Sequence, residues 1–210
     1  MKLYSYIVKH DTGFAPNPFY GYCTLACCKP IIRRKAEEGD WIVGLTPKSA
    51  GNEIVYFMRV DDVVPSFGDY WTDSRFRAKK PSQTGELRKR CGDNIYEPYG
   101  KGYRQLPSTH SRKDGTEHAG NKAHDLSGKR ILVSETFAYF GSKPLSLPRE
   151  LRSLIVGRGH RCRFSDETKA AFVRFAGTAG FGVRAAPRQW TQGDNSWMKG
   201  AGCTPRKTNC

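Results

Sequence analysis

The chain has 210 residues, of which 38% are apolar and 12% aromatic, so it is long enough to bury a sizeable core as one domain. Its 35 lysines and arginines face only 20 acidic residues, and the resulting formal charge of +15 favours a polyanionic partner, nucleic acid first. No apolar run is long enough for a membrane span or a secretory signal, and the seven cysteines indicate reduced thiols, so we expect a cytoplasmic protein with no membrane partner.

The N-terminal part predicts a sheet and one short helix. Residues 2–8 are rich in β-branched and aromatic types and predict a strand, and residues 22–28 form a second extended stretch. Pro30 suits a first helical turn and Gly39 a left-handed C-cap, which predicts a helix over 30–38. The runs "WIVGLT" and "EIVYFMRVDDVV" then predict two strands, separated by "PKSAGN", which has hairpin composition.

The C-terminal part alternates polar segments with structured ones. Residues 75–90 hold seven basic residues around a Pro/Ser/Gly break and predict a mobile basic loop. Residues 107–128 almost lack large apolar side chains, and we expect little order there. Two strand-like runs follow from 130 to 140, then a short helix near Pro148 and a helix over 166–176 with an acidic first turn.

Strands outnumber helices, and the helices fall between groups of strands. This arrangement favours the α+β class, as a small open barrel or a curved mixed sheet flanked by short helices, over a doubly wound α/β fold. We expect a single domain over residues 1–190 that carries a basic and polar insertion at 78–128. The composition after Trp190 predicts a disordered tail over 191–210.

Several common catalytic and metal-binding motifs are incomplete or absent in this sequence. The "DTG" at 11–13 is the tripeptide of aspartic proteases, but no second copy supplies the partner carboxylate. The cysteines in "CTLACC" show no Cys-x-x-Cys pair, which favours small buried thiols over zinc ligands. No glycine-rich phosphate loop or serine elbow occurs. We therefore predict no metal and no cofactor.

What remains is a set of loops in which polar and aromatic residues alternate. "IVKHDTGFAPNPFYGYCTLACCKP" at 7–30 is the longest, and similar clusters lie at 68–76, 92–107 and 157–164. A protein that handles one nucleobase extracts it from the stack and recovers the cost by aromatic stacking and hydrogen bonds to the base edge. Asn94 suits such an edge, and the stacking candidates are Phe19, Trp41, Tyr70, Trp71 and Tyr96.

The nucleic-acid backbone would be held by basic residues near these clusters. The candidates are Arg75, Arg77, Lys79, Lys80, Arg158, Arg161 and Arg163. Plainer roles compete with the binding roles. Trp41 is as suitable for the core as for a binding cage, and His160 alone is more often a satisfied buried histidine.

Two resemblances sharpen this interpretation. "GDWIVGLTPKSAGNEIVYFMRVDDVVPSFGDYWTDSRFRAKK" at 39–80 resembles the central part of EVE-type domains of the PUA-like superfamily. More of the chain, through "HDTGFAPNPFYGYCTLACCKPIIRRKAEEGDWIVGLTP", "GDNIYEP", "FAYFG" and "VGRGHRCRF", resembles the second nucleotide-modification-associated domain family, found in bacteria and phages near genes linked to DNA base modification. The resemblance implies a PUA-like barrel with helices and a pocket that includes His10, Thr12, Asn17, Trp41, Leu45, Thr46, Tyr70 and Trp71.

Three functions stay open at this stage. The first is a reader that binds a modified, flipped base, in DNA rather than RNA, and directs a partner or takes part in defence against phage. The second is an enzyme on the flipped base, a glycosylase or modifying enzyme, in which Asp11 or Asp93 acts as general base or electrostatic stabiliser and His160 as general acid. The third is an RNA-binding PUA-like module.

Overall fold

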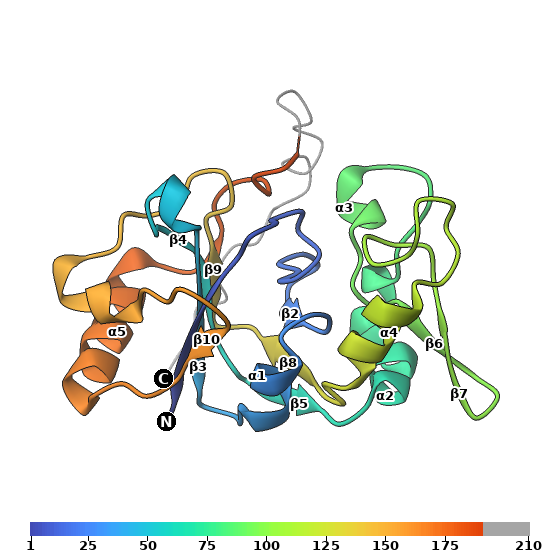
Figure 1. Ribbon diagram of the computed structural model, residues 1–210, viewed down its shortest axis with the longest axis horizontal. Coiled ribbons are helices and arrows are strands. Elements are labelled where there is room, and N and C mark those ends of the chain that lie inside the picture. The colour runs from blue at the N-terminus through green and yellow to red at the C-terminus, as the bar shows by residue number, and fades with distance from the viewer. Residues whose placement is uncertain (191–210) are drawn as a thin grey trace, which may run out of the picture.

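A six-stranded mixed sheet forms the centre of the computed structural model, which describes residues 1–190 (Figure 1). The strand order is β10-β1-β3-β4-β9-β11. The strands are β1 (Leu3–Ile7), β3 (Trp41–Leu45), β4 (Ile54–Arg59), β9 (Phe137–Tyr139), β10 (His160–Arg161) and β11 (Gly182–Val183). The strands predicted at 2–8 and at "WIVGLT" are thus confirmed in this sheet, whereas the run "EIVYFMRVDDVV" divides into β4 of this sheet and a separate strand over Asp62–Val64 that belongs to another sheet.

The pairing of β1, β3 and β4 fixes the register of the sheet. β1 runs parallel to β3, with Leu3 opposite Trp41 and Ile7 opposite Leu45. β3 turns through the predicted hairpin segment into antiparallel β4. A Cβ at Gly44 would lie 2.4 Å from a ring carbon of Tyr56, so glycine permits the close approach of these strands.

Both faces of the central sheet are buried. Successive residues of β1 alternate between the two faces. Tyr4, Ile42 and Tyr56 belong to a core shared with β2 and α1, whereas Leu3 and Trp41 belong to a core shared with α5. Figure 1 shows α5 on one side of the sheet and α1, β2 and β8 on the other. Burial on both faces explains why these strands read as nearly continuous apolar runs.

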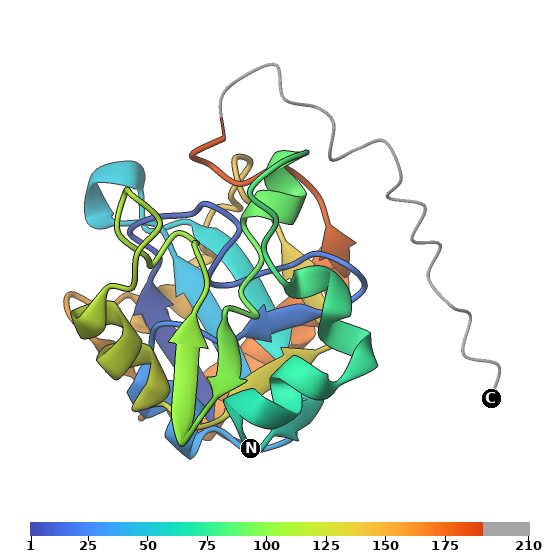
Figure 2. The same ribbon diagram turned by 90° about the vertical axis from the view of Figure 1, so that its right-hand side faces the viewer.

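A second group of elements lies beside the central sheet, on the side away from α5 (Figures 1 and 2). It contains a three-stranded sheet in the order β2-β8-β5 and the hairpin β6-β7. The strands are β2 (Cys23–Leu25), β5 (Asp62–Val64), β6 (Tyr96–Tyr99), β7 (Gly102–Gln105) and β8 (Ile131–Ser134). The helices are α2 (Phe67–Thr72), α3 (Leu87–Arg90) and α4 (Ala119–Leu126).

The remaining helices begin where the sequence predicts. α1 (Pro30–Lys35) has proline in its first turn, although it ends before the expected residue 38 because Ala36 is already extended. α5 (Asp166–Ala179) begins after Ser165, whose hydroxyl accepts a hydrogen bond from the backbone N–H of Thr168. The chain also forms 3₁₀ turns at Lys48–Ala50, Ser74–Lys79 and Arg149–Leu154.

Two expectations about order were wrong. The basic segment 75–90 contains a 3₁₀ turn and α3, and the polar segment 107–128 contains α4. Their side chains are held by distant parts of the chain, as the site below shows. The fold class is α+β, with mixed sheets and short helices, but the sheets of residues 1–190 do not close into a barrel. The tail expected at 191–210 lies outside the described residues.

Within residues 1–190, no helix has the length and apolar character that a membrane crossing requires.

Candidate functional site

A cavity of about 560 Å³ opens where β1 ends and α1 begins. The loop after β1 contributes His10, Thr12 and Phe14 to its wall, and the turn before α1 contributes Cys28. Two further walls come from the segment around His110 and from the end of the loop before β10. Residues from four distant parts of the sequence therefore meet around one space.

Cys28 occupies a tight turn between β2 and α1. The φ angles of 58° at Cys28 and 41° at Lys29 are left-handed, a conformation that costs non-glycine residues roughly 1–2 kcal/mol each. The Cys28 N–H donates to Asp125 Oδ1 at 2.7 Å, and Arg33 Nε donates to the Cys28 carbonyl at 2.8 Å. A backbone held in an unfavourable conformation by several contacts is typical of functional sites.

Arg33 ties this turn to the segment that supplies the rest of the site. Its side chain is fully buried on α1. Its guanidinium donates to the carbonyls of Cys28, Asp125 and Arg130, which lie before α1, at the end of α4 and at the start of β8. Because each of its three guanidinium nitrogens donates to a main-chain carbonyl inside the protein, Arg33 serves to position Cys28 and Asp125.

The imidazole of His110 links the thiol of Cys28 to the carboxylate of Asp125. Its Nε2 lies 3.5 Å from Cys28 Sγ, and its Nδ1 lies 2.6 Å from Asp125 Oδ2. The ring of Phe14 packs against it with the ring centroids 4.7 Å apart. Thiol, imidazole and carboxylate thus stand in the order that cysteine-dependent acyl-transfer sites use.

Asp125 is a well-satisfied buried carboxylate. Oδ1 accepts from the Cys28 N–H, and Oδ2 accepts from His110 and from the Tyr96 hydroxyl at 2.9 Å. Burial alone would raise the pKa of Asp125, but these hydrogen bonds and the charge of His110 lower it below its ordinary value. The carboxylate therefore stays ionised and can orient the imidazole.

The protonation of His110 follows from its two partners. Burial acts to lower its pKa, but the hydrogen bonds with Asp125 and Cys28 outweigh it and raise the pKa of His110 to about 10. At neutral pH the ring is therefore an imidazolium. Both ring nitrogens then carry a proton, one facing the Asp125 carboxylate and the other facing the Cys28 sulfur.

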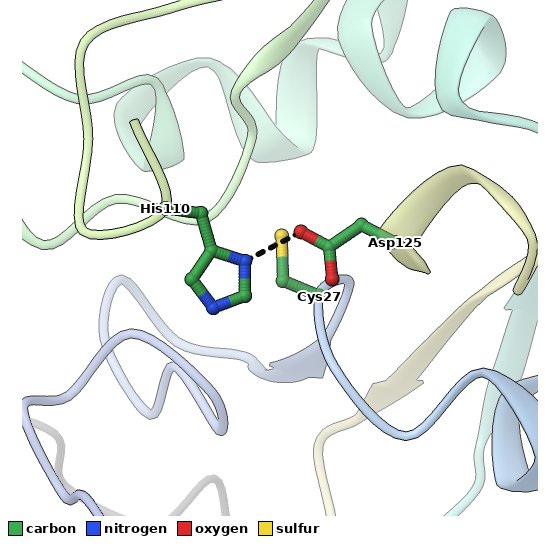
Figure 3. Close-up of side chains that lie close together, drawn as sticks. All are labelled: Cys27, His110 and Asp125. Atoms are coloured by element: carbon green, nitrogen blue, oxygen red, sulfur yellow. Dashed lines mark hydrogen bonds and ion pairs between the residues drawn. The ribbon is translucent and has the colours of Figure 1, made fainter. Parts of the chain in front are cut away.

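Cys27, His110 and Asp125 also place potential metal-ligand atoms within 4.8 Å of one another (Figure 3). The Asp125 oxygens, however, already accept from His110, from the Cys28 N–H and from the Tyr96 hydroxyl. The Cys27 thiol is fully buried, and burial raises its pKa well above the ordinary value. A metal ion would displace these donors and would require the buried Cys27 thiol to ionise. The contacts of His110 and Asp125 are therefore better explained by the chain of Cys28, His110 and Asp125, which we call the relay, than by a metal site.

A second histidine on the wall, His160, has its pKa shifted in the opposite direction, towards the neutral imidazole. Burial, followed by the positive charges of Lys29 and Lys35, lowers the pKa of His160. His110, in contrast, holds its proton. Two imidazoles of one cavity with their pKa values pushed apart are typical of sites that use both an acid and a base.

The sequence-based site residues divide into those at the cavity and those elsewhere. Of the residues assigned to base recognition, His10 and Thr12 line the cavity, and so does His160, the candidate general acid. Asp11 lies behind this wall, where it is buried and accepts hydrogen bonds from the Tyr139 hydroxyl and from the Arg188 N–H. Burial raises the pKa of Asp11. Asp11 thus ties the first loop to the chain after β11.

Five other candidates bind one another in the protein interior. Lys79 Nζ donates to Asn17 Oδ1 at 2.7 Å. The Tyr70 hydroxyl donates to Asp93 Oδ1 at 2.8 Å, and Asn94 Nδ2 donates to the Tyr70 carbonyl at 2.9 Å. All five are almost fully buried. Lys79 is therefore not placed to meet a phosphate, and the network joins the first loop to the segment before β6.

The candidates on β3 belong to the core or to a turn. Trp41 is 6% exposed and packs on Phe172 of α5, with the ring centroids 5.6 Å apart. Leu45 is fully buried in the same core. Thr46 follows β3, and its hydroxyl donates to the Ala50 carbonyl at 2.8 Å, closing the hairpin turn.

The remaining aromatic candidates have intramolecular partners. Phe19 stacks on Trp190 at 5.5 Å between ring centroids. Trp71 lies under the ammonium of Lys80, 3.6 Å from Nζ to the ring centroid. Tyr96, considered for stacking, instead donates to Asp125. None of these three rings lines the cavity around Cys28.

The basic candidates differ in how free their charges are. Arg75 pairs with Asp62 and Asp73 at 2.9 and 2.7 Å. Arg161 donates to the carbonyl of Ser153 at 3.2 Å. The other four candidates are exposed or half-buried: Arg77, Lys80, Arg158 and Arg163. Arg158 directly precedes the part of the cavity wall that contains His160.

Sequence reasoning missed the three residues of the relay. Cys28, His110 and Asp125 share no local motif, because 82 residues separate the first two and 15 the last two. Cys28 was interpreted as a small core thiol, and His110 fell in a segment expected to lack order. The available signal was a cysteine directly before the start of a helix at Pro30, with histidines elsewhere in the chain.

Comparison with known families gives a match over most of the chain. The family model described as "Nucleotide modification associated domain 2" matches residues 1–194. Neither the curated proteins nor the solved structures give a match. The EVE and PUA-like resemblance of residues 39–80 therefore stays a prediction.

Proposed function

Because the chain belongs to the nucleotide modification associated domain 2 family, we propose that it is a thiol-dependent enzyme that removes an acyl group from a modified base in DNA. The base enters the cavity beside Cys28, and Cys28 is the nucleophile. The formal charge of +15 supports a nucleic-acid substrate. DNA is favoured over RNA because the family resemblance points to genes linked to DNA base modification.

One observation carries this proposal. The Cys28 sulfur opens onto the cavity and lies 3.5 Å from His110 Nε2, while Asp125 holds the other ring nitrogen at 2.6 Å. A purely structural cysteine needs neither a charged imidazole nor a strained turn that presents it to a cavity. A binding cage needs flat faces and hydrogen-bonding groups, but it does not need an activated thiol.

The chemistry can be written with residues of this chain and water alone. The Cys28 thiolate attacks the carbonyl carbon of the acyl group, an S–C bond forms, and the carbonyl electron pair moves to oxygen. When the carbonyl reforms, the bond from carbon to the base nitrogen or oxygen breaks, and His110 donates its proton to the leaving group. His110 then takes a proton from water, whose oxygen attacks the thioester, breaks the S–C bond and releases the acid.

The cavity wall supplies groups for holding the base. His10 and Thr12 offer hydrogen-bonding atoms for a base edge, and the almost fully buried rings of Tyr6 and Phe14 form an apolar part of the wall. Lys29 adds a positive charge near the thiol, with its Nζ 4.5 Å from the centre of the Tyr6 ring. These residues support binding of a flat, polar-edged group next to the nucleophile.

The first test measures the reactivity of each thiol. Peptide-resolved mass spectrometry after brief iodoacetamide treatment at neutral pH should show alkylation of Cys28 well ahead of Cys162, which is also half-buried and serves as the internal control. The variant His110→Gln should abolish this advantage. If Cys28 and Cys162 react at equal rates in the wild type, the thiol is not activated and the proposal fails.

The second test follows the substrate. Oligonucleotides that carry one N-acetylated cytosine or adenine should lose the acetyl mass on incubation with the wild-type protein but not with Cys28→Ala. If both proteins bind the modified strand more tightly than the unmodified strand and its mass never changes, the protein is a reader of modified DNA. Equal competition by RNA of any sequence would instead indicate an RNA-binding module.

A further inference from the structure

A second hollow of about 740 Å³ adjoins the cavity of Cys28. The two spaces share Thr12 and Thr109 in their walls. The other walls of the second hollow come from the segment 82–91, which includes α3, from the loop 107–115, and from Trp190. The two hollows are therefore neighbours that meet at Thr12 and Thr109.

The second hollow is positively charged. Arg90, Arg112 and Lys113 line it and are exposed. Within residues 1–190, none of the three forms an ion pair with a carboxylate. The single acidic residue of the wall, Asp114, accepts hydrogen bonds from the N–H and the hydroxyl of Thr116. Arg112 also acts on the charge of Asp114, but three cations against one carboxylate leave the wall with an excess of positive charge, which suits an anionic group.

Trp190 gives this hollow a fixed aromatic surface. Its ring stacks on Phe19 with an angle of 20° between the planes, and its Nε1–H donates to the Thr12 carbonyl at 2.9 Å. The indole is therefore held by two contacts, one of them to Thr12, which lines both hollows. An aromatic side chain fixed in this way can stack a base without the entropic cost of ordering it first.

We propose that the second hollow binds the DNA strand next to the base that enters the Cys28 cavity. The neighbouring phosphate lies on Arg112 and Lys113, and the neighbouring base lies against Trp190. The substrate is then a base within a polynucleotide strand and not a free nucleotide. This inference deepens the proposed function, on which it rests for the placement of the base beside Cys28.

The test compares two variants from which equal charge has been removed. Arg112→Ala/Lys113→Ala removes two cations of the second hollow, and Arg149→Ala/Arg152→Ala removes two exposed cations from the 3₁₀ turn Arg149–Leu154, which packs beside α5 on the far side of the central sheet. Fluorescence anisotropy measures the affinity of each protein for a labelled nine-nucleotide DNA strand over a series of salt concentrations. An RNA strand of the same sequence and the 5′-mononucleotide serve as competitors.

We expect the slope of log affinity against log salt to fall by about 0.7 in the first variant, since both cations hold the same phosphate and each phosphate contact to a single strand contributes about 0.7. The control variant should keep the wild-type slope, and the mononucleotide should compete poorly. Equal slopes in the two variants would overturn the proposal. So would a mononucleotide that competes as well as the strand, and an RNA strand that competes as well as DNA would overturn the assignment to DNA.

The alkylation rate of Cys28 without DNA separates this proposal from the proposed function. Both double variants should keep the wild-type rate, because neither removes a contact of Cys28, His110 or Asp125. An unreactive Cys28 together with the expected loss of slope would remove the thiol chemistry and leave the strand site. A reactive Cys28 together with unchanged slopes would remove the strand site and leave the thiol chemistry.

Discussion

Asp125 joins three segments of the chain through one carboxylate. It accepts hydrogen bonds from the Cys28 N–H, the Tyr96 hydroxyl and the His110 ring, so it fixes both the turn that presents the thiol and the imidazole that contacts it. The network of Lys79 and Asp93 contrasts with this arrangement. Burial lowers the pKa of Lys79 to about 8 and raises the pKa of Asp93 despite their mutual attraction, so this buried pair serves position more than stability.

Replacement of the carboxylate tests its orienting role. In Asp125→Asn, the amide cannot stabilise the imidazolium, and cleavage of an N-acetylated oligonucleotide should fall by on the order of 10⁴-fold, as when the carboxylate of a protease triad is replaced. Binding of the strand should change much less. The measurement is a single-turnover rate beside an anisotropy titration.

Asp166→Asn is the matched control for that substitution, because Asp166 is an exposed carboxylate at the start of α5 that pairs with Lys169 and contacts no residue of the relay. It should retain the wild-type cleavage rate. Retention of full activity by Asp125→Asn would show that the carboxylate is only structural. A variant that lost binding and cleavage in equal proportion would also contradict the orienting role.

At the scale of elements, the junction of β3 and β4 places the cavity. The bulge at Gly44 and Leu45 lies directly opposite Tyr56, whose hydroxyl pairs with Tyr6 of the cavity wall at 2.8 Å. A Cβ at Gly44 would also lie 2.5 Å from a methyl group of Val8, which lines the same wall. The end of the strand pair thus sets the shape of one side of the site.

Gly44→Ala should therefore destabilise the protein, by about 1–3 kcal/mol, since the new methyl group overlaps core atoms of two neighbouring strands. Urea unfolding measures the loss. Gly177→Ala on α5 is the control, because no neighbour lies within 4 Å of its added Cβ and alanine favours the helix by roughly 0.5–1 kcal/mol. If the two substitutions changed the free energy of unfolding in the same direction, the packing argument would be wrong.

At the scale of the whole molecule, the relay couples stability to pH. The folded pKa of His110, about 10, lies above its ordinary value of 6.5, so the native state holds this proton more tightly than the unfolded chain does. The stabilisation is fully present below pH 6.5 and is lost as the pH rises through about 10. Asp125 acts at the other end, since its lowered pKa gives a stabilisation that is lost as the pH falls below its ordinary value of 3.8.

A comparison of the wild type with His110→Gln isolates the histidine. The difference in free energy of unfolding should be about 1.5–3 kcal/mol at pH 6, the range for a hydrogen bond to a charged group. The difference should shrink steadily towards pH 10. Above pH 6.5 the unfolded wild type loses the His110 proton while the folded wild type keeps it, and His110→Gln has no such proton. Titration of Lys79 occurs in both proteins and cancels. A difference that does not vary with pH would contradict the raised pKa.

The sequence was informative where a segment's structure depends on its own pattern. The apolar runs of β1, β3 and β4 and the capped start of α5 predicted real elements. The segment 107–128 was not predictable, because its order comes from contacts such as the bond of Asp125 to Cys28, 97 residues away. For the same reason Asn17 and Asn94 were indistinguishable from ligand-binding amides until the structure showed their partners.

The thiol and the group that activates it come from separable parts of the chain. Cys28 precedes a helix packed on the central sheet, whereas His110 and Asp125 both lie within 107–128, a stretch that holds none of the six central strands. Loss of that stretch would remove His110 and Asp125 together, and with Asp125 the acceptor of the Cys28 N–H that holds the turn. A single deletion within 107–128 would therefore remove two of the three relay residues and loosen the turn that carries the third.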